Sequence, residues 1–251
     1  MAADLSVIII TQNEQEDIEE CLKSVSELAA EIVVVDSGST DETLSICRRY
    51  TNKIFHKDWN GFSEQKQYAL DKAKGPWVLN IDADERVSKA LRAEIQEMLT
   101  APGESLNAFQ IPFHNFFMGR RLRFGGSTAE THIRLFKKAE ASYGSQSVHE
   151  GIKVKPPVGD LSGAIDHYSY KSVQDYLEKC NRYTSMIAQE KFKRGERFRF
   201  WQHFRLPYEF LVRYGIKLGF LDGEVGFKYA LLSAYYVWMK YIKLKDLEAS
   251  K

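Results

Sequence analysis

Short apolar runs alternate with helical patterns through the first third of the chain. The apolar runs are rich in β-branched residues and too uniformly hydrophobic for strands with one wet face, so they predict buried strands. The pattern predicts strands at 5–10, 32–35, 53–56 and 77–81, and helices at 17–27, 41–50 and 63–74. Buried strands that alternate with helices predict a mostly parallel sheet with helices on both faces, the Rossmann-like class of α/β fold.

The second half of the chain predicts two more strands followed by a long helical region. Two further strands are predicted at 108–113 and 132–136, and the pattern is helical from Ser172 to the end. Breaks in the helical part are expected at Gly195, at Pro207 and over 215–226. We therefore expect an α/β domain over residues 1–170 and an α-helical region over residues 171–251.

Composition and charge narrow the class of protein. The 251 residues are 44% hydrophobic and 27% charged, which fits one large globular domain with or without an appendage. The net charge of +1 gives no general attraction to nucleic acid, so no nucleic-acid partner is expected. The charge is uneven, because residues 191–217 hold eight Lys and Arg against two acids. An acidic front and a basic back predict two different tasks.

The cysteines and the lengths of the apolar stretches predict the cellular location of the protein. The three cysteines, Cys21, Cys47 and Cys180, are far apart and form no disulfide or metal-binding pattern, which is typical of a reducing compartment. No secretory signal precedes the apolar run at Leu5, and no uncharged apolar stretch reaches ~18 residues. A cytoplasmic protein without a spanning helix is expected.

Polar clusters fall at the ends of three predicted strands. They are Thr11–Glu14, Asp36–Asp41 and Asp82–Glu85. Ligands of open α/β sheets bind at the carboxyl ends of the strands, so this coincidence predicts a binding site there.

The sharpest cluster is Asn80-Ile81-Asp82-Ala83-Asp84-Glu85. The carboxylates of Asp82 and Asp84, one residue apart at a strand end, can share a hard divalent cation, Mg²⁺ or Mn²⁺, and a cation held in this way neutralises a diphosphate leaving group. The alternative is an acid-rich start of a helix.

The second cluster, Asp36-Ser37-Gly38-Ser39-Thr40-Asp41, allows two interpretations. The Asp36 carboxylate can accept a hydrogen bond from a nucleoside, and the turn lets a ligand approach the backbone. Equally, it is a strand, a turn and a helix cap at Asp41.

These motifs, in this order, resemble glycosyltransferase family 2, the inverting enzymes of GT-A fold, over roughly residues 4–100. The resemblance implies a metal-dependent nucleotide-sugar transferase, usually of a uridine nucleotide. Carried over to this chain, it implies donor contacts at Thr11, Asn13, Glu14, Asp36, Ser37, Lys66, Asp82, Ala83 and Asp84. The DxD pair, Asp82 and Asp84, is implied to hold the metal. The family often has two acids where this chain has Asp36-Ser37.

Further motifs resemble the branch of lipopolysaccharide inner-core β-1,4-glucosyltransferases. They are Asn60-Gly61-Phe62, Gln65-Lys66-Gln67-Tyr68-Ala69, Arg134-Leu135-Phe136, Val148-His149-Glu150 and His167-Tyr168-Ser169-Tyr170. This resemblance implies UDP-glucose as donor and a lipid-linked core heptose as acceptor.

Four residues outside the strand ends are candidates for the chemistry. Lys66 meets a phosphate or is a solvated lysine. Glu150, placed where the family has its base, would deprotonate the acceptor hydroxyl, with Asp160 and Asp166 as rivals. His167 is a third candidate metal ligand or a packed histidine. Arg134 binds a phosphate or pairs with a surface acid.

The last part of the chain is rich in aromatic and basic residues. Residues 198–241 hold 14 of the 32 aromatic side chains, interleaved with Lys and Arg. One helical face would carry Leu231, Ala234, Tyr235, Trp238 and Ile242. Such a mixture is typical of a helix that lies on an anionic membrane, and an ordinary packing helix is the alternative. We expect a peripheral protein on the inner face of the bacterial inner membrane.

Three other functions compete with this one. Another family 2 transferase would use a different donor or acceptor. A nucleotidyltransferase would need a basic, Gly-rich loop after the first strand, where Thr11-Gln12-Asn13-Glu14 is acidic. A non-catalytic membrane scaffold would not need Asp82, Asp84 and Glu150.

Overall fold

The computed structural model describes residues 5–100, 106–127, 131–144 and 151–249. Contacts divide the chain into two compact units. Unit 1 contains residues 1–113 and 130–167, and unit 2 contains residues 114–129 and 168–251. The roles predicted for residues 1–170 and 171–251 stay predictions.

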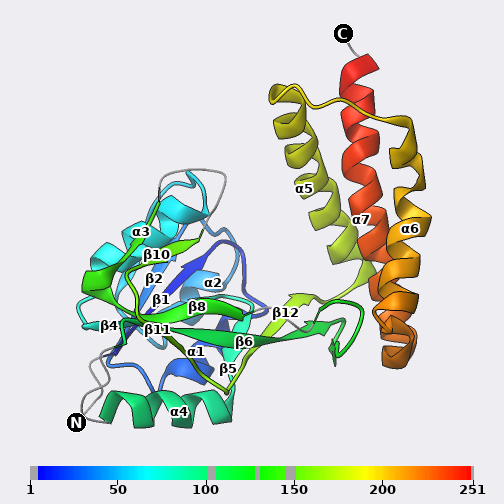
Figure 1. The fold of residues 1–251 in the computed structure, drawn as a ribbon. Helices are drawn as coiled ribbons and strands as arrows, with labels where there is room; N and C mark the ends of the chain where they lie inside the picture. The colour runs from blue at the N-terminus through cyan, green and yellow to red at the C-terminus, as the bar shows by residue number, and fades with distance from the viewer. Residues whose placement is uncertain (1–4, 101–105, 128–130, 145–150, 250–251) are drawn as a thin grey trace. The chain divides into compact units, whose positions relative to one another are not determined.

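Unit 1 is built on a mixed sheet whose first half is parallel (Figure 1). Its strands are β1 (Leu5–Thr11), β2 (Glu31–Asp36), β3 (Ile54–His56), β4 (Trp77–Asp82), β5 (Glu85–Val87), β6 (Ala108–Phe117), β8 (Thr131–Lys137), β9 (Ala141–Tyr143), β10 (Ile152–Val154), β11 (Val158–Asp160) and β12 (Ile165–Tyr170). The main order is β3-β2-β1-β4-β8-β6-β12-β5. β2, β1 and β4 are parallel neighbours, β8 runs antiparallel to β4, and β9 and β10 form a separate pair.

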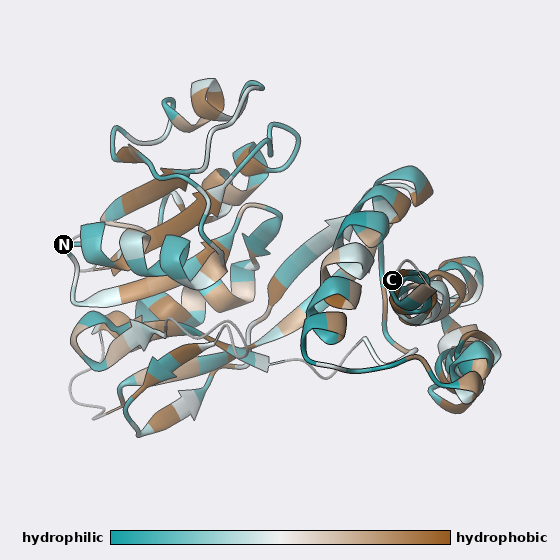
Figure 2. Cartoon of the chain, turned by 90° about the horizontal axis from the view of Figure 1, so that it is seen from above, coloured by the Kyte–Doolittle hydropathy of each residue, from teal (hydrophilic) through white to brown (hydrophobic). Residues whose placement is uncertain are grey.

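Helices cover both faces of this sheet. They are α1 (Ile18–Val25), α2 (Thr43–Cys47), α3 (Phe62–Lys72) and α4 (Lys89–Thr100). Alternate residues of β1 point to opposite faces: Leu5, Val7 and Ile9 pack with α1, α2 and α4, whereas Ile8 and Ile10 pack with α3 and β9. The strands are correspondingly the hydrophobic, brown centre of unit 1 in Figure 2. The predicted fold class is confirmed.

Glu31, at the start of β2, joins three segments at the amino end of the sheet. Its carboxylate accepts hydrogen bonds from the Ser6 hydroxyl, the Lys53 ammonium and the Lys74 backbone N–H. Burial works to raise the pKa of this carboxyl, but these bonds outweigh burial and lower the pKa from 4.5 to about 2. The charged form of Glu31 therefore stabilises the folded chain.

The pH dependence of stability should show this contribution. A carboxyl whose pKa is lower in the folded state stabilises above its unfolded pKa, and its contribution is lost as pH falls from about 4.5 to about 2. We expect Glu31→Gln to lower the free energy of unfolding at pH 7 by about 1–2 kcal/mol and to flatten its pH dependence in this window. Urea unfolding across pH measures both. Glu97→Gln, at an exposed position of α4, is the control, and an unchanged curve for Glu31→Gln would contradict the assignment.

Unit 2 is mainly helical. Its elements are β7 (Arg120–Arg121), α5 (Val173–Lys193), the 3-10 helix η2 (Phe200–Phe204), α6 (Arg205–Leu211), the π-helix η3 (Val212–Ile216), the 3-10 helix η4 (Gly219–Asp222) and α7 (Gly223–Ala249). Its core contains Phe117, Tyr176 and Val225, and the Tyr176 hydroxyl donates to the Leu232 carbonyl at 2.9 Å, which ties α5 to α7. No helix in the described ranges is both long enough and apolar enough to cross a membrane.

The helix break expected over 215–226 is present at 217–218 between η3 and η4, but it is shorter than expected because α7 begins at Gly223. The break expected at Pro207 is wrong. Pro207 lies in the first turn of α6, where its missing N–H has no partner to lose. Gly226 lies inside α7, where an added Cβ would fall 1.9 Å from the Gly219 carbonyl oxygen. A glycine there therefore permits close packing of η4 on α7 and does not end the helix.

The predicted membrane-facing side of α7 is partly used for packing, and its contact with a membrane stays a prediction. Ala234, at the centre of that face, is fully buried, and Tyr235 packs against the core of unit 2. Ala234 and Tyr235 therefore fit the alternative of a packing helix, whereas Leu231 of the same face is 40% exposed.

Candidate functional site

The three polar clusters meet at one edge of the parallel sheet. Thr11 pairs with Asp36 across β1 and β2, and Ile10 pairs with Asp82 across β1 and β4. The ends of these strands therefore place Thr11, Asp36 and Asp82 side by side, as the sequence predicts.

The loop after β1 and the turn after β2 are bound to each other. The Asn13 side-chain oxygen accepts from the Thr40 N–H at 2.8 Å, and the Asn13 N–H donates to the Ser39 hydroxyl at 2.9 Å. Asn13 has φ of +56°, a conformation that asparagine tolerates better than most residues. The Glu14 N–H donates to the Thr43 hydroxyl at 2.8 Å, so both segments form one preorganised rim.

Asp36 orders the turn at this rim. Its carboxylate accepts from the backbone N–H groups of Gly38 and Ser39 at 2.8 and 2.9 Å and from the Ser39 hydroxyl at 2.5 Å. The Ser37 N–H donates to the Thr11 carbonyl at 3.0 Å. The buried Thr11 hydroxyl has no hydrogen-bond partner among the described residues. This rim can receive a nucleoside, but Asp36 already serves the turn itself.

Asp82 lies between two cations. Its oxygens are 2.8 Å from the Lys66 ammonium and 3.0 Å from the Arg134 guanidinium. Burial works to raise the pKa of the Asp82 carboxyl, but the charges of Arg134 and Lys66 outweigh it and hold the pKa well below its usual range. The Lys66 side chain is only 13% exposed, so it is not the solvated lysine of the alternative interpretation.

Glu85 is a member of this group that the sequence analysis did not single out. It is 1% exposed, accepts from Arg134 at 2.5 Å and accepts from the Asp82 N–H at 2.8 Å. Burial raises the pKa of Glu85 to about 7, with help from the charges of Asp82 and Asp84 and against the charge of Arg134. The partner of Arg134 is therefore a buried acid, which neither sequence-based alternative for Arg134 included.

Removing the Arg134 charge should lower the free energy of unfolding. Arg134→Met leaves the buried Glu85 without its cation and leaves the partly buried Asp82 with Lys66 alone. We expect a loss of about 3–5 kcal/mol in the free energy of unfolding. Denaturant unfolding measures it. Arg134→Met combined with Glu85→Gln should recover part of the loss because one buried charge is then removed. Equal stability of Arg134→Met and the parent protein would contradict the burial of the network.

The second acid of the motif faces a histidine. β12 pairs with β5, which places His167 opposite Glu85. The His167 Nε2 atom lies 3.4 Å from Asp84 Oδ2. Burial works to lower the pKa of His167, but the hydrogen bond and charge of Asp84 outweigh it and raise the pKa. The Ala83 side chain between the two acids packs in the core, so a ligand can meet Ala83 only through its backbone.

The donor atoms at this edge fit a divalent cation held by few protein ligands. The described residues contain no cluster of three or more metal-binding side chains. Asp84 and His167 offer one carboxylate and one imidazole close together, whereas both Asp82 oxygens face cations. Mg²⁺ or Mn²⁺ at Asp84 would complete its shell with water and phosphate oxygens.

A cavity of about 370 Å³ lies next to the Asp82 network. It is lined by Lys66, Asn80, Gln110, Thr131, His132, Ile133, Arg134, Tyr143, Gly151 and Ile152. Lys66 and Arg134 supply positive charge, and the other polar side chains carry amides, hydroxyls and an imidazole. Three buried atoms of the residues that line this cavity have no hydrogen-bond partner in the described part of the chain, namely Asn80 Oδ1, Arg134 Nε and the Tyr143 hydroxyl oxygen. The wall can therefore bind a polyhydroxylated or anionic ligand.

The predicted base, Glu150, lies outside the described residues, and so does its neighbour His149. Gly151, the next residue in the chain, lines the cavity. The rival acids, Asp160 and Asp166, are absent from the described residues that line it. The role of Glu150 as the base stays a prediction.

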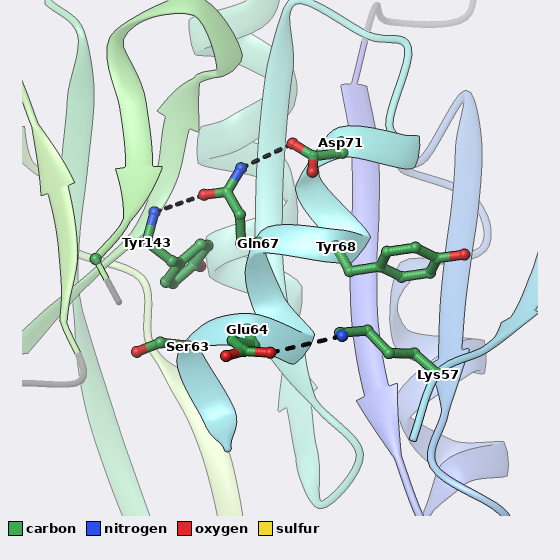
Figure 3. A pocket seen from close by; sticks show the side chains of 8 residues that line it. Lys57, Ser63, Glu64, Gln67, Tyr68, Asp71 and Tyr143 are labelled. Atoms are coloured by element: carbon green, nitrogen blue, oxygen red, sulfur yellow. Dashed lines mark hydrogen bonds and ion pairs between the residues drawn. The ribbon is translucent and has the colours of Figure 1, made fainter. Parts of the chain in front are cut away.

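A smaller cavity of about 250 Å³ lies on the outer side of α3 (Figure 3). Gln67 accepts from the Tyr143 N–H at 2.8 Å and donates to Asp71 at 2.7 Å. Lys57 pairs with Glu64 at 3.7 Å at its other end. Because Tyr143 lines both cavities, these contacts fix the wall of the larger one and the helix that carries Lys66.

Comparison with known proteins decides the family. The family described as "Glycosyl transferase family 2" matches residues 6–152, more than half of the chain. The chain belongs to glycosyltransferase family 2. This confirms the predicted membership, and the matched segment contains both polar loops, the DxD acids and Arg134.

Relatives within the family extend over almost the whole chain. The lipopolysaccharide core biosynthesis glycosyltransferase LpsC of Rhizobium meliloti is 32% identical, over 94% of this chain and 93% of its own. An uncharacterized glycosyltransferase of Rickettsia typhi is 31% identical, over 97% of this chain and 87% of its own. The predicted similarity to lipopolysaccharide core transferases is thereby confirmed. Among solved structures, S. aureus TarS 1–349 is 15% identical, with a TM-score of 0.49 over 98% of this chain and 92% of its own.

Proposed function

We propose that this family 2 transferase moves glucose from UDP-glucose, with inversion, onto a heptose of the lipopolysaccharide inner core. The observation that carries the proposal is the arrangement of Lys66, Asp82 and Arg134 between the sheet edge and the cavity, with Asp84 beside them. The nature of the acceptor is supported by the relation to a lipopolysaccharide core transferase.

The donor would lie across the carboxyl ends of β1, β2 and β4. The rim formed by Asn13, Glu14 and the turn at Ser37 would receive the nucleoside, with Thr11 and Asp36 beneath it. Lys66 and Arg134 would face the diphosphate and stabilise the charge that develops when UDP leaves. A divalent cation at Asp84, when bound, would neutralise part of the same charge.

The acceptor would enter the 370 Å³ cavity. Its hydroxyl oxygen forms a bond to the anomeric carbon of glucose while the bond from that carbon to the diphosphate oxygen breaks. The hydroxyl proton passes to the Glu150 carboxylate, and UDP leaves with the bonding electron pair. Attack from the face opposite the leaving group gives an inverted, β-linked product.

A panel of UDP-sugars with a truncated core acceptor tests this function. We expect acceptor-dependent release of UDP, fastest with UDP-glucose. Release from another UDP-sugar alone would assign a different donor within the same family. Release of pyrophosphate would point to a nucleotidyltransferase, and absence of any turnover would point to a membrane scaffold.

A further inference from the structure

The helical run over residues 200–216 of unit 2 exposes large apolar side chains and buries several polar ones. Its exposed positions include Trp201, Phe204, Tyr208 and Leu211, which follow the 3–4–3 spacing of one helical face. Leu211 is 63% exposed, and Ile216 in the π-helical turn that follows is 77% exposed. A helix on the surface of a water-soluble unit normally points such side chains inward.

The polar side chains of the same run point the other way. Gln202 is only 6% exposed, and its side-chain oxygen accepts from the Arg199 N–H at 2.9 Å. Arg205, on the partly buried side, pairs with Glu209 at 3.2 Å. Arg213 reaches the Tyr229 hydroxyl at 3.3 Å. Apart from the exposed His203, the polar side chains of the run are thus used inside unit 2, whereas many of its large apolar side chains are exposed.

The apolar surface continues on the neighbouring segment. Leu218, Phe220 and Leu221 around η4 and Phe227 in α7 are exposed. The rings of Phe210, Tyr214, Phe220 and Phe227 contact one another, with centroids 5.3–6.3 Å apart. Of the large apolar side chains that are exposed in the described residues, most lie between Phe200 and Leu231. We call this surface the apolar face; it consists of the exposed side chains of 200, 201, 204, 208, 211, 216, 218, 220, 221 and 227.

The apolar face lies in a basic stretch of sequence. Residues 197–217 contain five Arg and Lys and one acid. Arg197 and Arg199 are exposed at the start of the run. The guanidinium of Arg205 lies 5.3 Å from the Trp201 ring centroid. Exposed rings and aliphatic side chains beside basic groups match a bilayer surface with anionic headgroups, which takes up apolar side chains and attracts cations.

We propose that unit 2 docks on an anionic lipid bilayer through the apolar face of residues 200–227. This places membrane contact on the η2–α6–η3–η4 segment and not on the α7 face around Ala234 and Tyr235, which packs inside unit 2. Phe204, Tyr208 and Leu211 enter the acyl boundary, and Arg197 and Arg199 meet the headgroups. Because no step involves the sugar donor, this proposal stands apart from the proposed function.

Vesicle co-sedimentation of the full chain tests the apolar part. We expect the parent protein to sediment with phosphatidylcholine vesicles that contain phosphatidylglycerol. Phe204→Ser, Tyr208→Ser and Leu211→Ser together should lower the partition coefficient ~100-fold, the order expected for three large side chains withdrawn from a bilayer. The matched control replaces three exposed apolar residues of α5, Val173, Leu177 and Met186, by serine and should sediment like the parent. Thermal unfolding checks that both variants fold.

A second arm tests the charges. Arg197→Glu with Arg199→Glu should weaken binding to the anionic vesicles, and 1 M salt should weaken binding of the parent protein in the same way. No sedimentation of the parent protein, or equal sedimentation of the apolar-face variant and the parent, would overturn the proposal. Ultracentrifugation without lipid provides a further check. If the parent protein forms a dimer, and the apolar-face variant is a monomer that still binds vesicles like the parent, the proposal is overturned. The apolar face would then bind a second copy of the chain.

Discussion

Asp84→Ala is expected to abolish metal-dependent binding of UDP-glucose and to lower kcat/KM by ~10³-fold or more, the range for loss of several kcal/mol of charge stabilisation. Asp84 Oδ2 lies 3.4 Å from the His167 imidazole, whereas both oxygens of Asp82 face cations. We therefore propose that Asp84, more than Asp82, binds the cation. Calorimetry with UDP-glucose, with and without Mn²⁺, measures the effect.

Asp82→Ala should differ from Asp84→Ala in its effect on stability. Both variants should lose donor binding, but only Asp82→Ala also leaves Lys66 and Arg134 without their common carboxylate and should unfold more easily. Asp58→Ala, whose side chain is 94% exposed, is the control and should behave as the parent. Wild-type affinity and full turnover in Asp84→Ala would show that this acid does not hold the metal.

Glu150→Gln should keep donor binding and lose transfer, with kcat reduced at least ~10²-fold, the lower range for a positioned acid–base group. The amide is nearly isosteric with the carboxylate but cannot take the acceptor proton. Single-turnover kinetics with UDP-glucose and a truncated core acceptor measure the loss, and calorimetry confirms that the donor still binds.

The rival acids provide the comparison for Glu150. Asp160 is exposed on β11, and Asp166 lies on β12 opposite Arg86, so neither replacement should approach the effect of Glu150→Gln. If Asp160→Asn or Asp166→Asn lost transfer while Glu150→Gln turned over normally, the base would have to be reassigned.

The strands of the sheet could be predicted because each is specified by a short run of neighbouring residues. The β-branched runs at β1, β2 and β4 are apolar on both faces, and each ends in a polar cluster, so strand, burial and binding edge follow from the same few residues. The sequence offered His167 as a metal ligand or as a packed histidine. Its position beside Asp84 could not be predicted locally, because it needs β12 to lie beside β5, about 80 residues earlier in the chain.

Other features could not be predicted from local patterns. Arg134 and Glu85 are 49 positions apart, and only the fold shows that they share a buried ion pair. An Arg on a strand and a third acid after a DxD motif are the signals that were available. The exposure of apolar side chains over residues 200–216 is likewise hidden in the sequence, since periodicity shows that a helix has two faces and packing decides which one is buried. For the same reason the sequence could not show that Ala234 and Tyr235 of α7 pack inside unit 2.

The configuration of the sugar linkage tests the central claim most directly. The parent protein is incubated with UDP-glucose, Mn²⁺ and a truncated inner-core acceptor that ends in heptose, and the product is examined by NMR. The account predicts a single new glucosyl residue with a β-anomeric proton coupling and stoichiometric UDP. An α-linked product, or no product from any UDP-sugar with a protein that is folded and carries Asp84, would contradict it.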